Sequence, residues 1–98
     1  MSYALTKITA NIDMDLNDNT GYQYFLIDAG SNNVNVDLTN QIWDGLTFIY
    51  CRTDSSTSVV SLTAKTGTTI NNAASINIAV GQMAEIVCYG TNWYAHVY

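Results

Sequence analysis

The sequence predicts a single all-β domain of about eight strands, arranged as a jelly-roll-like sandwich or a flattened barrel, with at most one helical turn. Three observations predict this class. Val, Ile, Thr, Tyr, Phe and Trp together outnumber the residues that favour helices. Apolar and polar residues alternate along several segments, and turn-forming clusters recur about every ten residues. No comparable stretch has helical periodicity.

The length of 98 residues corresponds to one domain, here 1–98, with an N-terminal strand region at 1–20 and a β core at 22–98. A chain of this size buries roughly 60 to 70 per cent of its unfolded surface. It can therefore fold without metal or disulfides, and oligomerisation would add stability.

The first strands are of two kinds. Residues 12–16 and 33–38 alternate between apolar and polar side chains, which is typical of strands with one face in water. Residues 22–27 and 46–51 are apolar almost throughout, which indicates strands covered on both faces or placed at an interface. A turn around Thr39 to Trp43 is the best helical candidate.

The remaining strands are short until the end of the chain. We expect strands at 58–63, 68–70 and 76–78, and a C-terminal hairpin made of 83–89 and 92–98. Gly90 should adopt a positive φ in the hairpin turn, and Trp93 should be largely buried. Gly81, Gly90 and Trp93 are the structural candidates.

Charge and cysteine content narrow the range of functions. The net charge of −5 disfavours phosphate and nucleic-acid binding, which needs clustered Lys and Arg. Cys51 and Cys88 form no CxxC motif, so we expect thiols rather than a zinc site or a bridge. No signal peptide or membrane span is visible, so the chain is expected to be complete, soluble and made in a cytoplasm.

The residues that commonly protect strand edges from pairing with other chains are scarce, because proline is absent and lysine occurs only at Lys7 and Lys65. A closed barrel or contacts between subunits would protect the strand edges. The scarcity of charge and the 11 per cent of aromatic residues favour contacts between subunits.

Catalytic signals are weak. His96 is the only histidine, no Ser lies in a Gly-x-Ser-x-Gly elbow, and no Gly-rich loop precedes a helix. We therefore expect no enzymatic activity and no cofactor.

The acidic segment from Asp13 to Gly21 resembles a calcium loop only superficially. Asp18 stands where an EF-hand loop needs Gly, and Tyr24 stands where it needs a bidentate Glu. The segment is better interpreted as the solvent face of a strand that runs into a turn, without a metal site.

The aromatic residues allow two interpretations. They could form a sugar-binding platform, or they could fill the core and subunit contacts, and the second is favoured. The candidates for the subunit interface are Tyr22, Tyr24, Trp43 and Tyr94.

The last third of the chain, with Gly67-Thr68-Thr69-Ile70-Asn71 and the segment from Gly81 to Tyr94 ending in Gly-Thr-Asn-Trp-Tyr, resembles small β domains of tailed-phage virion proteins. These are tips of tail and head fibres and capsid-decoration modules. Segments 34–38 and 45–49 are similar to a further step of that pattern, so the resemblance covers roughly residues 22 to 95. Thr39 stands where the family often has Pro.

The resemblance implies a non-enzymatic homotrimer at the virion surface, assembled in the host cytoplasm. It would be a decoration, cement or short appendage protein that caps and reinforces the capsid or tail. Its partners would be further copies of itself and capsid or tail proteins, with no nucleic acid and no membrane. The alternative is a lectin-like module that recognises a cell-surface glycan. Exposed aromatics clustered at one loop end would favour the lectin, and an apolar patch with a polar rim would favour the virion protein.

Overall fold

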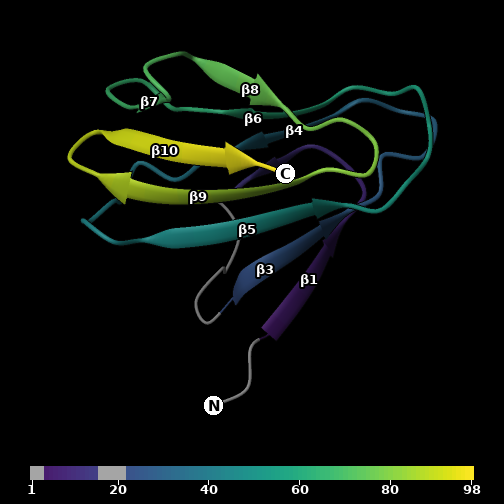
Figure 1. Cartoon of the computed structure of the whole chain (residues 1–98), viewed down its shortest axis with the longest axis horizontal. Coiled ribbons are helices and arrows are strands. Elements are labelled where there is room, and N and C mark those ends of the chain that lie inside the picture. The colour runs from purple at the N-terminus through teal and green to yellow at the C-terminus, as the bar shows by residue number, and fades with distance from the viewer. Residues whose placement is uncertain (1–3, 16–21) are drawn as a thin grey trace.

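The computed structural model describes residues 4–15 and 22–98, with the side chains of residues 4, 5, 22 and 23 left aside. Over these ranges the chain forms ten strands in two sheets and no helix (Figure 1). The strands are β1 (Ala4–Ile8), β2 (Ile12–Asp13), β3 (Tyr22–Ile27), β4 (Val34–Asp37), β5 (Thr47–Arg52), β6 (Val60–Thr63), β7 (Thr69–Ile70), β8 (Ser75–Asn77), β9 (Met83–Tyr89) and β10 (Asn92–Val97). A search of the described residues for a helix that could span a membrane finds none.

The chain passes back and forth between the two sheets. The first sheet has the strand order β1-β3-β5-β9-β10-β7, and the second has the order β2-β4-β6-β8. Within the first six strands, neighbours in each sheet run parallel, so β1–β2, β3–β4 and β5–β6 form three stacked coils. Figure 1 shows β1, β3, β5, β9 and β10 of the first sheet in front, with β4 and β6 of the second sheet farther from the viewer and β8 above them. Strand β9 then adds antiparallel to β5, and the β9–β10 hairpin extends the front sheet.

This pairing differs from the jelly-roll-like arrangement predicted from the sequence. A jelly roll is built from antiparallel strands, whereas β1–β3, β3–β5, β2–β4, β4–β6 and β7–β10 are parallel. The reason is that most of the connections cross from one sheet to the other instead of turning back as hairpins. The predicted helical turn is also absent from the described structure: residues 44–45 form a turn closed by a hydrogen bond from the Leu46 amide to the Trp43 carbonyl.

The two sheets enclose one hydrophobic core. Alternate residues of β4, β5, β6 and β9 point inward and are buried, as their period of two predicts. Four aromatic rings lie at its centre: Phe25 stacks on Tyr50 at 5.0 Å, and Phe48 lies 5.8 Å from Trp93. Trp93 is fully buried and Gly90 has a φ of 65°, in agreement with the prediction for the hairpin.

The edges of both sheets explain how the chain manages without proline. The edge strands are β1 and β7 in the front sheet and β2 and β8 in the second. Three of these four have only two or three residues. Very short edge strands offer little backbone for pairing with another chain, and this shortness protects both edges of the second sheet.

Candidate functional site

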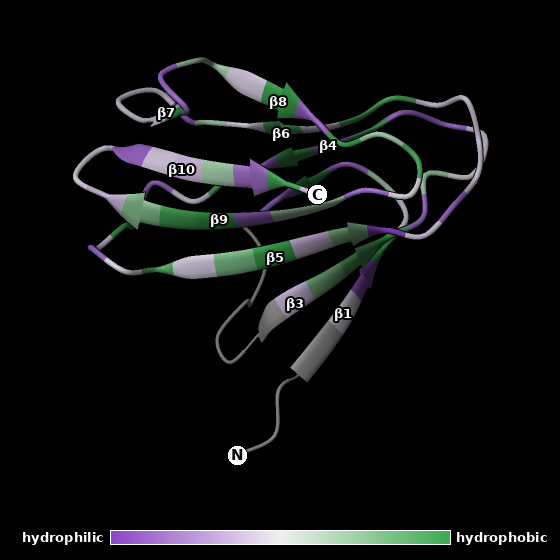
Figure 2. Cartoon of the chain, in the orientation of Figure 1, coloured by the Kyte–Doolittle hydropathy of each residue, from purple (hydrophilic) through white to green (hydrophobic). Residues whose placement is uncertain are grey.

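The outer face of the front sheet carries a group of adjacent apolar side chains. Its side chains come from the residues of β3, β5 and β9 that point away from the core. Tyr24 pairs with Ile49, Leu26 with Cys51, and Cys51 with Met83. All five side chains are half-buried in the single chain. Figure 2 shows the hydrophobic character of β5 and β9. We call these five residues the apolar patch: Tyr24, Leu26, Ile49, Cys51 and Met83.

Charge lies at two borders of the apolar patch and has opposite signs there. Lys7 of β1 stands beside Leu26, and Glu85 of β9 stands opposite Ile49. Lys7 makes an exposed ion pair with Asp28, at 3.7 Å. The patch is therefore an apolar surface with a polar rim, the arrangement typical of protein–protein contacts.

A shallow open hollow of about 520 Å³ lies next to the patch, over β9 and β10. Two cross-strand pairs build it: Val87 with Tyr94, and Glu85 with His96. The His96 ring contacts that of Tyr98, with 4.4 Å between centroids. The hollow is lined by Thr47, Asn71, Glu85, Val87, Tyr94, Ala95 and His96.

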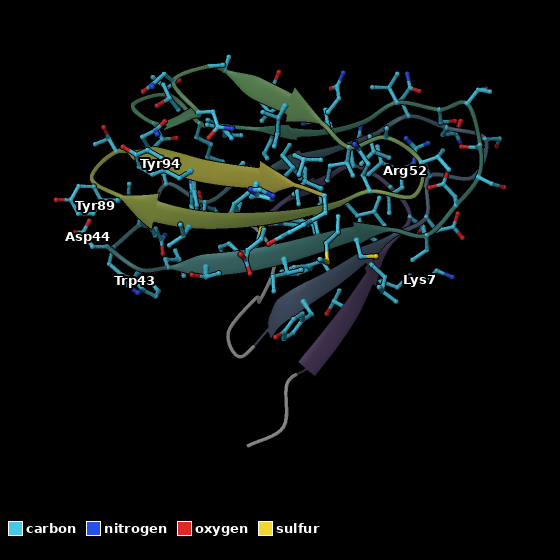
Figure 3. The ribbon with its side chains drawn as sticks, in the orientation of Figure 1. Lys7, Trp43, Asp44, Arg52, Tyr89 and Tyr94 are labelled. Carbon is cyan, nitrogen blue, oxygen red and sulfur yellow. The ribbon has the colours of Figure 1, made fainter. Side chains whose placement is uncertain are left out.

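An aromatic corner adjoins the hollow at one end of the sheet and consists of Trp43, Asp44 and Tyr89 (Figure 3). Trp43 and Tyr89 are among the most exposed large side chains described, at 63 and 67 per cent, and Tyr94 of the hollow is 51 per cent exposed. Backbone contacts hold the corner in place. The Gly45 amide donates to the Cys88 carbonyl, and the Gly90 amide donates to Asp44 Oδ1, both at 2.8 Å.

The four residues predicted for a subunit interface fall in different places. Tyr24 belongs to the apolar patch, whereas Trp43 and Tyr94 lie at the corner and hollow on the other side of the face. The side chain of Tyr22 lies outside the described set. The patch residues Leu26, Ile49, Cys51 and Met83 were not singled out from the sequence. The sequence carried a signal for an apolar outer face, because apolar residues occupy both odd and even positions in 22–27 and 46–51. Both faces of these two strands are therefore apolar.

The acidic segment has an internal cation. Lys65 bonds to the carboxylates of both Asp13 and Asp15, and Thr39 donates to Asp15. The hydrogen bond from Lys65 lowers the pKa of Asp13. Burial opposes this effect at Asp15, but the bonds from Lys65 and Thr39 still lower its pKa. No three metal-ligating side chains gather within residues 4–15 and 22–98. The rest of the predicted acidic segment, 16–21, lies outside the described residues.

The two cysteines are free and lie on opposite faces of the front sheet. Cys51 points outward in the apolar patch, and Cys88 points into the core. Burial, with the charge of Asp44 adding to it, raises the pKa of the Cys88 thiol. A thiol of this kind is less reactive, because the thiolate is the nucleophile.

No protein family, curated protein or solved structure matches this chain. The fold and its surfaces define an all-β protein of two sheets, with an apolar patch, a hollow and an aromatic corner on one face.

Proposed function

We propose that this protein is a non-enzymatic structural component of a phage virion. It works as a homotrimer that caps and reinforces the capsid or tail, as a decoration, cement or short appendage protein. The observation that carries the assembly is the apolar patch on the outer face of the front sheet. The virion and the threefold symmetry rest on the resemblance of segments 67–71 and 81–94 to tailed-phage β domains.

The apolar patch supports self-association through its burial energetics. Removing apolar surface from water yields roughly 25 cal/mol per Å². The half-buried side chains of Leu26, Ile49 and Met83 still expose part of their surface. A contiguous patch with a polar rim is the usual mark of an interaction site. A second copy of the chain presents the same apolar patch and can therefore cover it.

The distribution of charge also favours contact between copies. Each chain carries −5, which opposes association in general. However, Asp13, Asp15 and Asp54 are paired with Lys65 or Arg52 away from the patch. At the patch itself Lys7 and Glu85 have opposite signs, so closed rotational symmetry can bring the Lys7 border of one subunit toward the Glu85 border of the next.

Light scattering at micromolar concentration tests the assembly. The wild type is expected to have about three times the chain mass of 10.7 kDa. Ile49→Lys places a charge in the patch beside Glu85 and should give a monomer. Because position 49 is half-buried, the variant should keep the native circular dichroism spectrum. Val80→Lys is the matched control, since Val80 is exposed in the loop between β8 and β9, and should stay trimeric. A monomeric wild type with a native circular dichroism spectrum would reject the assembly.

The place in the virion needs a separate measurement. Mass spectrometry of purified virions, from a phage whose genome encodes the chain, should detect it in stoichiometric amount. Virions that lack the chain should lose resistance to heat or to osmotic shock. Its absence from intact virions would reject the structural role, whatever the oligomeric state.

A further inference from the structure

We infer that the hollow over β9 and β10, together with the aromatic corner, is a binding site for a neutral saccharide. The site goes beyond the proposed structural role and does not depend on it, because the hollow lies mainly over β9 and β10, whereas most of the apolar patch lies on β3 and β5 and borders the hollow at Glu85.

The size and shape of the hollow fit a small ligand. Ligand sites are commonly concave, with volumes of roughly 300 to 1,000 Å³. The hollow, at about 520 Å³, falls within this range and is open to solvent. An open site on a sheet face is accessible to one end of a chain-like ligand, as a surface glycan would require.

The lining of the hollow combines one aromatic ring with mixed polar groups. Tyr94 and Val87 pair across β9 and β10 and give it apolar surface. The apolar face of a pyranose ring packs on such a surface, as other flat ligands do on aromatic side chains. Thr47, Glu85 and His96 add a hydroxyl, a carboxylate and an imidazole, which can bond to sugar hydroxyls as donors and acceptors.

The charge of the site excludes anionic ligands. No Lys or Arg is among the residues that line the hollow, and the charged groups around it are the acids Glu85 and Asp44. Phosphate groups and acidic sugars would be repelled, since anion recognition relies on Lys, Arg or helix N-termini. A neutral ligand rich in hydroxyl groups is the chemistry that this lining matches.

The aromatic corner extends the site beyond one sugar ring. Trp43 is exposed but its turn is fixed, because the Leu46 amide donates to its carbonyl and the Gly45 amide is bound to Cys88. Tyr89 follows Val87 by two residues on the same outer face of β9. An aromatic side chain carried on a fixed turn leaves less backbone freedom to be lost when a ligand stacks on it. The ligand class is therefore an oligosaccharide, with rings at the hollow and at Trp43.

Saturation-transfer NMR with the full chain tests the site, using maltotriose, cellotriose and chitotriose as neutral probes, 3′-sialyllactose as an anionic probe and choline as a cationic probe. At least one neutral trisaccharide should bind. Trp43→Ala and Tyr94→Ala should each weaken it by about tenfold or more, with unchanged circular dichroism. Val59→Ala, which trims an exposed apolar residue before β6, should leave binding within about twofold.

Four results with these probes would overturn the inference, and a fifth concerns the assembly variant. The first is that no neutral probe binds, and the second is that 3′-sialyllactose binds more tightly than the neutral probes. The third is that only choline binds and that Asp44→Asn abolishes its binding. The fourth is that the wild type and the two aromatic variants bind a neutral probe equally well. Leu26→Lys, which places a charge in the patch beside Lys7 and on β3, away from the hollow, separates this site from the proposed function. A monomer that still binds the saccharide supports the site even if virion analysis rejects the structural role. Loss of binding in Leu26→Lys would place the ligand between subunits and reject the hollow.

Discussion

Arg52 and Asp54 form a buried ion pair, with 3.1 Å between Nη2 and Oδ2, that ties together one end of both sheets. Arg52 ends β5 in the front sheet, and its guanidinium donates to the carbonyls of Ile78 and Ser58, which adjoin strands of the second sheet. Asp54 accepts the Ala29 amide, just beyond β3. Figure 3 places Arg52 at the end opposite the aromatic corner. The aromatic corner is therefore far from this ion pair, and substitutions at the corner should not separate the two sheets.

Removing Arg52 should destabilise the protein strongly. Arg52→Met leaves the buried carboxylate of Asp54 without its cation and the carbonyls of Ile78 and Ser58 without a donor. We expect the melting temperature to fall by at least about 10 °C. Lys7→Met, which breaks an exposed pair with Asp28, is the control and should cost less than about 1 kcal/mol. An equal fall in melting temperature for the two variants would contradict the structural role of the Arg52–Asp54 ion pair.

Acid should weaken the fold through Asp54. The hydrogen bonds from Arg52 and Ser56 and from the Ala29 amide hold the pKa of Asp54 well below its usual range. A carboxylate whose pKa is lower in the folded state stabilises the fold above its unfolded pKa of about 3.9, and this contribution is lost as the pH falls. Stability should therefore decrease from about pH 5 downward. Urea unfolding of Asp54→Asn should show lower stability at pH 7 and a flatter dependence between pH 5 and 3; an unchanged slope would count against Asp54 as the source.

Trp93 should contribute most of the C-terminal anchoring. Its ring is fully buried beside Phe48, so Trp93→Ala should cost about 3 to 5 kcal/mol. Tyr94→Ala, at the next position on the opposite face, should cost less than about 1 kcal/mol. Denaturant unfolding of the two variants measures the contrast, and similar costs would mean that burial does not decide it.

Calcium should leave the thermal stability unchanged. The Lys65 ammonium already pairs with both Asp13 and Asp15 and would compete with a divalent ion for these carboxylates. Melting curves with excess Ca²⁺ and with a chelator should coincide. A clear rise with Ca²⁺ would reveal a site, because a ligand that binds only the folded state stabilises it.

Thiol labelling should report assembly at the apolar patch. Cys51 lies in the patch, so a thiol reagent should modify it more slowly in the trimer than in the Ile49→Lys monomer. Cys88 is buried and its pKa is raised, so it should react only after unfolding and serves as the internal control. Mass spectrometry measures the rate of labelling at each cysteine. Equally fast labelling of Cys51 in both proteins would exclude the patch from the contact between subunits.

The sequence alone predicted the local structure well, because an extended chain alternates its faces with a period of two. Val34, Val36 and Leu38 were expected to point one way and are all buried. The strand 83–89 has the predicted bounds, and Gly90 has the positive φ that its turn needs. These properties depend on neighbours in the chain, so local pattern and turn chemistry determine them.

Strand pairing was decided only by the tertiary structure. Ile8 pairs with Ile27, and Ile27 with Arg52, at unequal spacings along the chain that leave no repeat in the sequence. Alternation in the sequence defines the two faces of a strand but does not define which strands are its neighbours. The observed pairing therefore differs from the expected jelly roll.

The separation of Tyr24 from Trp43 has the same origin. Both looked alike as aromatic interface candidates. The pairing of β3 with β5 puts Tyr24 on the apolar patch, and the turn before β5 puts Trp43 at the corner. The sequence determined which residues are apolar and which strands they form. Only long-range backbone hydrogen bonds decided which of these residues share a surface, because the partners in a sheet lie far apart along the chain.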